Sequence, residues 1–350
     1  MSGWSVSSIS AELRAIAVAL QWAARSGVDL EQRIGDGSLL TAVEIIALRD
    51  ALRMNLVTQG TVVPLVFYTR CLHVRDYIEW RAEHSLQKRQ GDDPLLGYSR
   101  HRLAEFMKNM MEFLPKPQSG TRQGITAEAE RRLFEVIRPG HPENPFRAKN
   151  QHRNQALILL YCQLGIRLSE ALVLKGQDLD LHGPEPGLVV HRRADDPDDT
   201  RADPPLVKTA SRLLPLSQEL RGILLEWVTI HRADRDRYPG AKKIPYVFVS
   251  ARGTPLGKRS VSAMLNLLAA MPGLEGLSAH PLRHRWNDAF SELCDETNVP
   301  EEKEQSMRET LMGWKKGSKM AQTYTQRSTR KAASKASLAL QRKNTREGIQ

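Results

Sequence analysis

Cysteine is scarce in this sequence, with only Cys71, Cys162 and Cys294 among 350 residues. The three lie far apart and form no Cys-x-x-Cys pair, so the sequence indicates neither a disulfide scaffold nor a zinc site. Long apolar runs are also missing: no stretch approaches the roughly 20 residues that a membrane-spanning helix needs. Residues 1–20 lack a basic lead-in followed by an apolar core and a cleavage site. These absences predict a soluble, cytoplasmic protein.

A nucleotide-binding motif of the GxxxxGK[ST] type is absent as well, which argues against a reaction driven by ATP. Charge, in contrast, is unbalanced. The chain has 51 Lys and Arg against 40 Asp and Glu, a formal net charge of +11. A basic excess favours a polyanionic partner such as nucleic acid. The length is sufficient for two domains, each with its own core.

The first third of the chain predicts helices. Apolar residues recur at helical spacing in 9–27, 41–54, 64–86 and 99–114, with Thr41 as a candidate N-cap and Pro64 in a first-turn position. We expect the arginines scattered over these helices to be solvated: Arg70, Arg75, Arg100 and Arg102. The segment "LPKPQSGTRQG", 114–124, has two prolines and two glycines and little to bury, which is typical of a linker.

The rest of the chain has a different pattern. Thr126 is a candidate N-cap for a helix over 125–137. Two short β candidates, 187–193 and 206–217, flank an acidic, proline-rich segment at 194–205 and predict a hairpin with an enlarged loop; 246–250 predicts a further strand. The fold class is therefore mainly α with a small β-sheet (α+β). The predicted divisions are a helical domain 1–115, a linker 116–125, a second domain 126–329 and a basic tail 330–350.

Arg167 lies in the otherwise apolar stretch "CQLGIRLSEALVL", 162–174. A buried guanidinium is costly unless it meets an anion in a fixed geometry. Glu170, three residues later, is one candidate partner within the fold. The alternative is an anion from outside, such as a phosphate. The stretch alone leaves both interpretations open.

Other residues with chemical potential follow in order. They are Lys208 in the hairpin, His280 and Arg283 at i, i+3 in "AHPLRHRW", and Trp314 and Tyr324 in "LMGWKKGSKMAQTYTQ". Singly each is weak, since His-x-x-Arg occurs by chance and a lone tyrosine is usually packing. Taken together with the arginine at 167, the set resembles the tyrosine recombinase (phage integrase) family. That family has a Gly-x-Arg-x-Ser-Glu box, a hairpin lysine, a His-x-x-Arg box, Gly-His or Gly-Trp, and a nucleophilic tyrosine.

This sequence departs from the family pattern in two places. The spacing from Trp314 to Tyr324 is one residue longer than usual, and the hairpin loop before Lys208 is also longer.

The resemblance implies a two-domain clamp, with 1–115 as a core-binding, DNA-binding domain and 126–329 as a catalytic domain. It also implies a role for each residue. Two arginines would hold a DNA phosphate, the lysine would protonate the departing 5′-oxygen, the histidine would donate to an oxygen or accept the tyrosyl proton, and the indole would donate its N–H. The tyrosine would become linked to the 3′-phosphate. The residues concerned are Arg167, Lys208, His280, Arg283, Trp314 and Tyr324, with Glu170 supporting the first arginine. Neither a metal ion nor any other cofactor is implied.

The partners implied are double-stranded DNA recombination sites and further copies of the chain, as dimers and a tetrameric synapse, with no membrane. The expected role is integration, excision or transposition of a mobile element, in the cytoplasm at the nucleoid. The tail predicts a basic helix with a narrow apolar stripe (Ala332, Ala336, Ala339 and Leu340), and one interpretation is a helix that frays in solution. The resemblance implies the other, in which the stripe docks on a neighbouring protomer. The alternatives are a type IB topoisomerase-like activity and a non-cleaving DNA-binding accessory protein.

Overall fold

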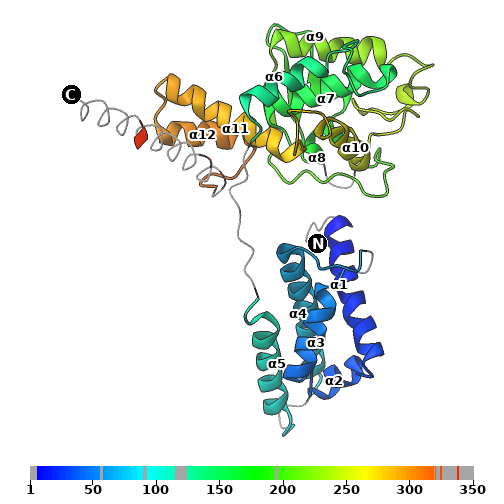
Figure 1. Ribbon diagram of the computed structural model, residues 1–350, viewed down its shortest axis with the longest axis vertical. Coiled ribbons are helices and arrows are strands. Elements are labelled where there is room, and N and C mark those ends of the chain that lie inside the picture. Colours follow the sequence, from blue (N-terminus) through cyan, green and yellow to red (C-terminus); the bar gives the residue numbers. More distant parts are fainter. Residues whose placement is uncertain are drawn as a thin grey trace. The chain divides into compact units, whose positions relative to one another are not determined.

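The computed structural model describes residues 6–55, 58–89, 93–114, 124–193, 196–318, 320, 324 and 337–338. The predicted linker, 116–125, and the predicted tail, 330–350, lie almost entirely outside these residues. The chain divides into two units, Met1–Gly120 and Thr121–Gln350 (Figure 1). It is mainly helical with a small three-stranded sheet, which confirms the predicted fold class.

Helices make up the described part of the first unit. They are α1 (Val6–Arg25), α2 (Leu30–Asp36), α3 (Ala42–Arg53), α4 (Pro64–Gln87) and α5 (Leu96–Met111). The predicted N-cap is confirmed, because Thr41 forms a capping box with Glu44 at the start of α3. Pro64 stands at the first position of α4, also as predicted. α4 packs against both α1 and α5 (Figure 1). The short α2, which the apolar spacing did not reveal, begins at an Asp29 cap.

Two of the arginines expected to be solvated stabilise the first unit instead. Arg70 donates from Nη1 to the carbonyls of Leu52 at 2.9 Å and Met54 at 2.8 Å. Those carbonyls belong to the end of α3, where backbone acceptors have no partner within the helix. Arg102 donates to the carbonyl of Leu40 at 2.9 Å. The expectation was wrong for these two because their guanidiniums reach across to neighbouring helix ends.

The second unit surrounds a helix that is buried on nearly every side. The helices of this unit are α6 (Ala127–Val136), α7 (Gln151–Leu164), α8 (Leu168–Leu172), α9 (Gln218–Glu226), α10 (Lys258–Ala269), α11 (Ala279–Glu296) and α12 (Glu301–Met312). Short 3₁₀ turns lie at Ala148–Asn150, Gly176–Asp178 and Ala241–Lys243. A π-helical turn, η3, spans Trp227–His231. α7 is the central helix, and it contacts α9, η3 and α11. Thr126 caps α6 as predicted. Within the described ranges, none of the helices combines the length and the hydropathy that a bilayer-spanning segment requires.

The sheet consists of β1 (Leu179–Asp180), β2 (Gly187–Val190) and β3 (Arg212–Pro215), paired antiparallel in that order. The predicted hairpin is therefore present, although its strands are shorter than expected and β1 was not anticipated. The long loop between β2 and β3 carries Lys208. This loop is anchored by ion pairs, among them Lys175 with Asp196 at 2.8 Å and with Asp198 at 2.7 Å.

The prediction of a strand at 246–250 was wrong. This segment makes only isolated bridges, from Tyr246 to Lys175 and from Val249 to Pro255. Backbone bonds to it are few, such as the one from the N–H of Leu256 to the carbonyl of Phe248 at 3.0 Å, and side chains bond to other carbonyls. Trp227 Nε1 donates to Val247 at 3.1 Å, and an arginine of α7 donates to Val249 at 3.0 Å. The apolar, β-branched composition reflects burial here, because all backbone groups need partners but those partners need not form a sheet.

Candidate active site

Arg167 is positioned by the way α7 ends. Gly165 terminates the helix in the left-handed conformation, with φ of +58°. The chain then turns directly into α8, for which Arg167 is the N-cap residue. Its backbone N–H donates to Glu170 Oε2 at 2.8 Å, and its guanidinium Nη1 lies 3.4 Å from Glu170 Oε1. About a third of the Arg167 side chain remains exposed. It therefore has an internal partner and still faces solvent.

Glu170 is fully buried at the centre of a polar cluster. Arg212 of β3 donates to Glu170 Oε2 at 2.9 Å, and the Thr209 hydroxyl donates to Oε1 at 2.6 Å. Burial alone would raise the pKa of this carboxyl. The bonds from Arg212, Thr209 and the backbone of Arg167 outweigh that effect and lower the pKa to about 2. Glu170 is thus held as a carboxylate that joins α8, β3 and the loop carrying Lys208.

Lys208 and Trp314 line the same cavity as Arg167. The cavity measures about 860 Å³ and lies between the β2–β3 loop and the turn after α12. The N–H of Ala210 donates to the carbonyl of Gly313 at 3.1 Å, which fixes the loop against the turn. Among the described residues, the cavity lining includes five basic side chains and no acidic one: Arg167, Arg192, Lys208, Lys315 and Lys316. Such a lining favours an anionic ligand.

Arg283 of α11 contacts Trp314, one of the residues that line this cavity. Only 5% of Arg283 is exposed, and its Nη1 donates to the carbonyl of Gly165. Its guanidinium lies over the Trp314 ring, 5.6 Å from the centroid. Burial, followed by the neighbouring charge of Arg167, lowers the pKa of Arg283 to about 9. Among the described residues, neither Arg283 Nη2 nor Trp314 Nε1 has a hydrogen-bond partner. Two adjacent buried donors of this kind suit an anion that supplies acceptor oxygens.

Tyr324, the last of the six predicted residues along the chain, completes the arrangement. Its ring stacks on Trp314, with centroids 5.9 Å apart and planes 8° from parallel. Its hydroxyl is hydrogen-bonded to His284 Nδ1 at 2.7 Å. His280 is exposed one helical turn before His284 and meets it edge to face at 4.6 Å. The structure thus brings all six predicted residues into one connected set, and it adds His284, whose imidazole is hydrogen-bonded to the tyrosyl oxygen.

Sequence reasoning missed three of the residues that form the site. His284 directly follows Arg283 and shares a helical face with His280 at i, i+4, a spacing that could have indicated it. Arg212 resembles any residue at a strand end, so its pairing with Glu170 has no local signal. Gly313 was noted only as part of the Gly-Trp pair. It ends α12 in the left-handed conformation, with φ of +65°.

Gly313→Ala is expected to destabilise the second unit. A Cβ at this position would lie 2.9 Å from the Ala210 carbonyl oxygen, 2.9 Å from Arg212 Nη1 and 3.1 Å from Thr209 Cβ. The left-handed conformation costs an alanine about 1–2 kcal/mol, and the close contacts add about 1–3 kcal/mol. Urea denaturation measures the change in the free energy of unfolding.

Gly273→Ala is the matched control for this variant. Gly273 has φ of +81° and nothing within 4 Å of the added Cβ, so only the conformational cost applies. Equal losses of stability in the two variants would contradict the packing described around Gly313.

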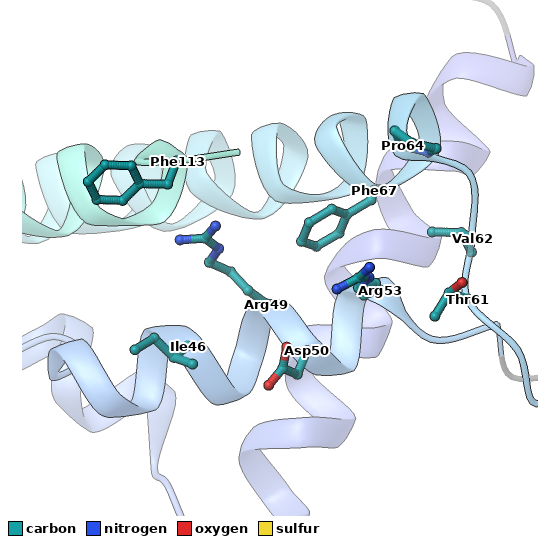
Figure 2. Close-up of a pocket in the computed structure, with 9 residues that line it drawn as sticks. All are labelled: Ile46, Arg49, Asp50, Arg53, Thr61, Val62, Pro64, Phe67 and Phe113. Carbon is teal, nitrogen blue, oxygen red and sulfur yellow. The ribbon is translucent and has the colours of Figure 1, made fainter. Parts of the chain in front are cut away.

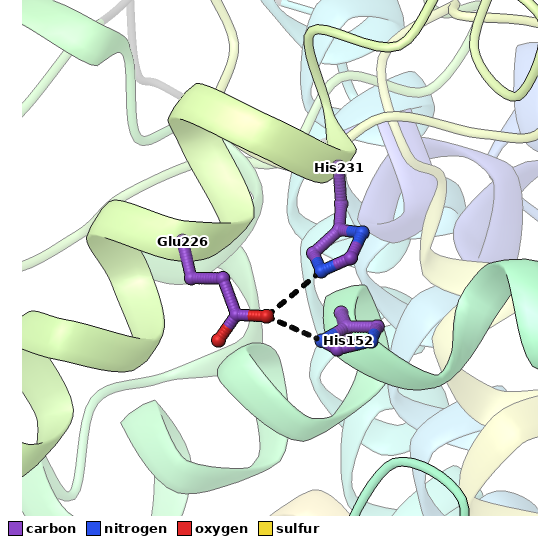
Figure 3. A group of neighbouring side chains, drawn as sticks. All are labelled: His152, Glu226 and His231. Atoms are coloured by element: carbon purple, nitrogen blue, oxygen red, sulfur yellow. Dashed lines mark hydrogen bonds and ion pairs between the residues drawn. The ribbon is translucent and has the colours of Figure 1, made fainter.

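A second cluster of titratable side chains lies at the other end of α7 (Figure 3). Glu226 Oε1 is 3.3 Å from His152 Nδ1 and 2.9 Å from His231 Nε2. The π-helical turn brings His231 to the same side as Glu226, five residues earlier. Burial and the neighbouring His231 lower the pKa of His152.

These residue types suit a zinc ion, but their arrangement favours a hydrogen-bonded network. The two imidazoles stack at 3.5 Å, so an ion in the plane of one ring would lie outside the plane of the other. The Arg237 guanidinium lies 3.3 Å from His231 Nδ1. A bond donated there leaves the proton on Nε2, facing Glu226. A ring would have to turn before the three groups could hold an ion.

The first unit has a separate hollow of about 490 Å³ beside α3 (Figure 2). Arg49 and Arg53 extend into it from α3, and Phe67 of α4 and Phe113 face them. Phe113 is 91% exposed. The hollow presents positive charge beside apolar rings, and its described lining also includes the carboxylate of Asp50 and the hydroxyl of Thr61.

Three comparisons with known proteins bear on these residues. Residues 125–331 match the model of the phage integrase family. Tyrosine recombinase XerC of Pseudomonas fluorescens is 28% identical over 190 residues, which are 54% of this chain and 54% of that protein. The chain therefore spans about half the length of this curated relative.

Two solved structures were also found. One is the XerH site-specific recombinase in a post-cleavage complex with palindromic difH substrate. Its identity is 17% and its TM-score 0.49, over 85% of this chain and 84% of that one. The other is the Tn1549 transposon integrase in complex with circular intermediate DNA, with 14% identity and a TM-score of 0.45 over 89% and 94%.

Proposed function

Because the chain belongs to the phage integrase family, we propose that it is a site-specific DNA recombinase that cleaves and rejoins strands through a 3′-phosphotyrosine. The observation that carries this proposal is the position of the Tyr324 hydroxyl. It is hydrogen-bonded to an imidazole and its ring stacks on Trp314, which lines the basic cavity. A tyrosine held only by packing would need neither the base nor the cationic surroundings.

In the proposed reaction, the Tyr324 oxygen attacks a DNA phosphorus. A bond forms between that oxygen and phosphorus, and the bond from phosphorus to the 5′-oxygen breaks. Lys208 gives its proton to the departing 5′-oxygen. The phosphodiester is exchanged for a phosphotyrosyl ester, so a 5′-hydroxyl of another strand can reverse the step without ATP.

The proton on the tyrosyl oxygen leaves through His284 in this proposal. Its Nδ1 is 2.7 Å from that oxygen, within the range for direct transfer. His280 then acts on a phosphate oxygen, the other of the two roles expected for it. This assignment follows from which imidazole contacts the hydroxyl.

The negative charge that grows on the phosphate is stabilised by fixed donors. Arg167 and Arg283 hold the non-bridging oxygens, and Trp314 Nε1 adds a neutral donor. The unpartnered Arg283 Nη2 and Trp314 Nε1 support these roles, since their bonds become complete only with a bound anion.

We further propose separate roles for different segments of the chain. Residues 1–115 act as the core-binding domain, with Arg49 and Arg53 contacting DNA phosphates, and 126–329 act as the catalytic domain. Recombination proceeds in a tetramer assembled on two double-stranded sites, with the tail 330–350 exchanged between protomers. The names of the XerC and Tn1549 relatives support a role in recombination or transposition, here of a mobile element.

The decisive experiment uses DNA that the protein itself selects. Sequences enriched from a random pool are placed as two copies in one supercoiled plasmid, and protein–DNA adducts and products are resolved after denaturation. Adducts with exchanged strands are the expected result. Relaxation that needs no second site would indicate the topoisomerase-like alternative. Tight binding without any adduct would indicate an accessory protein.

Covalent adduct formation is expected to persist in excess EDTA. Arg167 and Arg283 supply the positive charge that a metal ion would otherwise supply at the phosphate. The measurement compares adduct yield with and without chelator, at one fixed ionic strength because phosphate contacts weaken steeply with salt. Activity that disappears with EDTA and returns with magnesium would contradict the proposed division of charge.

A further inference from the structure

Arg308 is a fully buried arginine on α12 that the proposed mechanism does not use. Burial lowers the pKa of its guanidinium. Only Nη2 is hydrogen-bonded, to Ser291 Oγ at 2.7 Å and to Glu304 Oε1. Nε and Nη1 have no hydrogen-bond partner among the described residues. Burying a charge with so few hydrogen bonds costs free energy of folding, whereas a leucine would fill much of the same space without that cost.

Two aromatic rings occupy the space around this guanidinium. Its central carbon is 5.3 Å from the centroid of Phe290 and 5.6 Å from that of Tyr324. Both distances are within the range of a cation–π contact, which is strongest where water is excluded. Tyr324 also stacks on Trp314 and bonds to His284, so three different side chains hold the one ring.

The pairing with Glu304 does not by itself explain Arg308. The two residues are four positions apart on the same helix, so their ion pair joins α12 to itself. A pair of this kind forms equally well on a solvated helix face, where it costs no desolvation. Ser291 of α11 accepts from Arg308 Nη2 and donates to Glu304 Oε1, so the buried pair also joins α12 to α11. Those bonds do not account for the contact of the guanidinium with the two rings.

We propose that Arg308 is a positioning residue for Tyr324, holding the ring in place and favouring the negative charge that its oxygen gains as the proton leaves. The inference rests on the proposed function, because it gives Tyr324 the role of nucleophile. Arg308 reaches DNA only through Tyr324. A nearby cation favours the charged form of a phenol.

Several charged or titratable groups among the described residues lie close to Tyr324 and Arg308. Tyr324 faces His284 and Arg283 of α11 and Arg308 of α12. Arg308 interacts in addition with three groups that carry or gain negative charge, Asp288, Cys294 and Glu304. The Arg308 guanidinium itself lies over the Tyr324 ring, so removing its charge acts directly on Tyr324.

The test is the rate of covalent adduct formation on supercoiled plasmid DNA as a function of pH, with full-length variants. Arg308→Met is expected to slow adduct formation about 30-fold at neutral pH, the equivalent of one desolvated cation–π contact. The pH of half-maximal rate should move upward. Arg308→Lys keeps the charge and should restore both the rate and the pH profile in large part.

Two further variants separate positioning from stability. Glu304→Gln combined with Arg308→Met avoids an unpaired buried carboxylate and should show the same upward shift. Phe290→Leu removes the other ring and loosens the same cluster, but should leave the pH profile unchanged. An Arg308→Met protein that is folded and has the unchanged rate and pH profile would overturn the proposal.

The outcome can be distinguished from a failure of the proposed function. If the unchanged protein forms no adduct at all, the recombinase assignment fails. If it forms an adduct that responds to none of the Arg308 variants, only the role of Arg308 fails.

Discussion

Tyr324→Phe is expected to bind DNA as tightly as the unchanged protein and to form no covalent adduct with it. The phenyl ring keeps its stack on Trp314 and its contact with Arg308, so the fold of the site is retained. The loss is the hydroxyl and its bond to His284, which costs about 1 kcal/mol of stability. A denaturing gel detects the adduct, and a mobility-shift assay detects binding.

Tyr98→Phe is the matched control for this substitution. Tyr98 lies in the first unit with 53% of its surface exposed, and it should give an unchanged adduct yield. Tyr324 is the only tyrosine after the His-x-x-Arg box, so no neighbouring phenol can replace it. An adduct formed by the Phe variant would refute the assignment of the nucleophile.

The two interpretations of Arg167 that the sequence left open are both represented in the structure. Glu170 receives the backbone N–H and approaches the guanidinium, as the i, i+3 spacing suggested. The side chain nevertheless lines the basic cavity, where an external anion would bind. Local spacing predicted the internal partner because both groups lie on one helical turn. It could not show which part of the guanidinium stays accessible.

The sequence also could not show that His284 contacts the tyrosyl hydroxyl, and the reason is a different one. His280 and His284 lie on the same helix, four residues apart, and either satisfies a general argument for a base. Which one meets the hydroxyl depends on where the chain returns with Tyr324, forty residues after His284. The sequence motif ends at Arg283, so the pattern drew attention to His280 and left out His284, which is hydrogen-bonded to the hydroxyl.

The segment 246–250 shows a similar limit on the fold. Its continuous run of apolar and β-branched residues is typical of a buried strand, and residues 246–249 are indeed buried. Long-range donors such as Trp227 take the place of a partner strand. Secondary structure depended here on which groups satisfied the backbone, and those groups come from other parts of the chain.

Glu170→Gln is expected to reduce both the stability of the second unit and the rate of adduct formation. The substitution leaves the guanidinium of Arg212 buried without its carboxylate, and only 5% of that side chain is exposed. Breaking a buried ion pair by removing one partner costs about 3–5 kcal/mol. The Gln side chain retains some hydrogen bonds, so we expect a loss of about 3 kcal/mol in the free energy of unfolding at neutral pH.

Glu128→Gln provides the control for this loss. Glu128 also pairs with an arginine three residues away, Arg131, but both side chains are largely exposed. An ion pair this exposed is screened by solvent and contributes little, so the control should remain close to the unchanged protein. Comparable losses in the two variants would show that burial of Glu170 does not determine its contribution.

The lowered pKa of Glu170 predicts how its contribution to stability changes with pH. The pKa of Glu170 is lowered from 4.5 to about 2 in the folded chain. The unfolded chain therefore takes up a proton at Glu170 before the folded chain does, and the stabilisation is fully present above pH 4.5. It is lost as the pH falls from that value through about 2.

The difference in free energy of unfolding between the unchanged protein and Glu170→Gln, measured by urea denaturation, should be constant near neutral pH and should narrow below pH 4.5. A difference that stayed constant down to pH 2 would mean that the carboxylate charge is not what holds Arg212 and Arg167 in place.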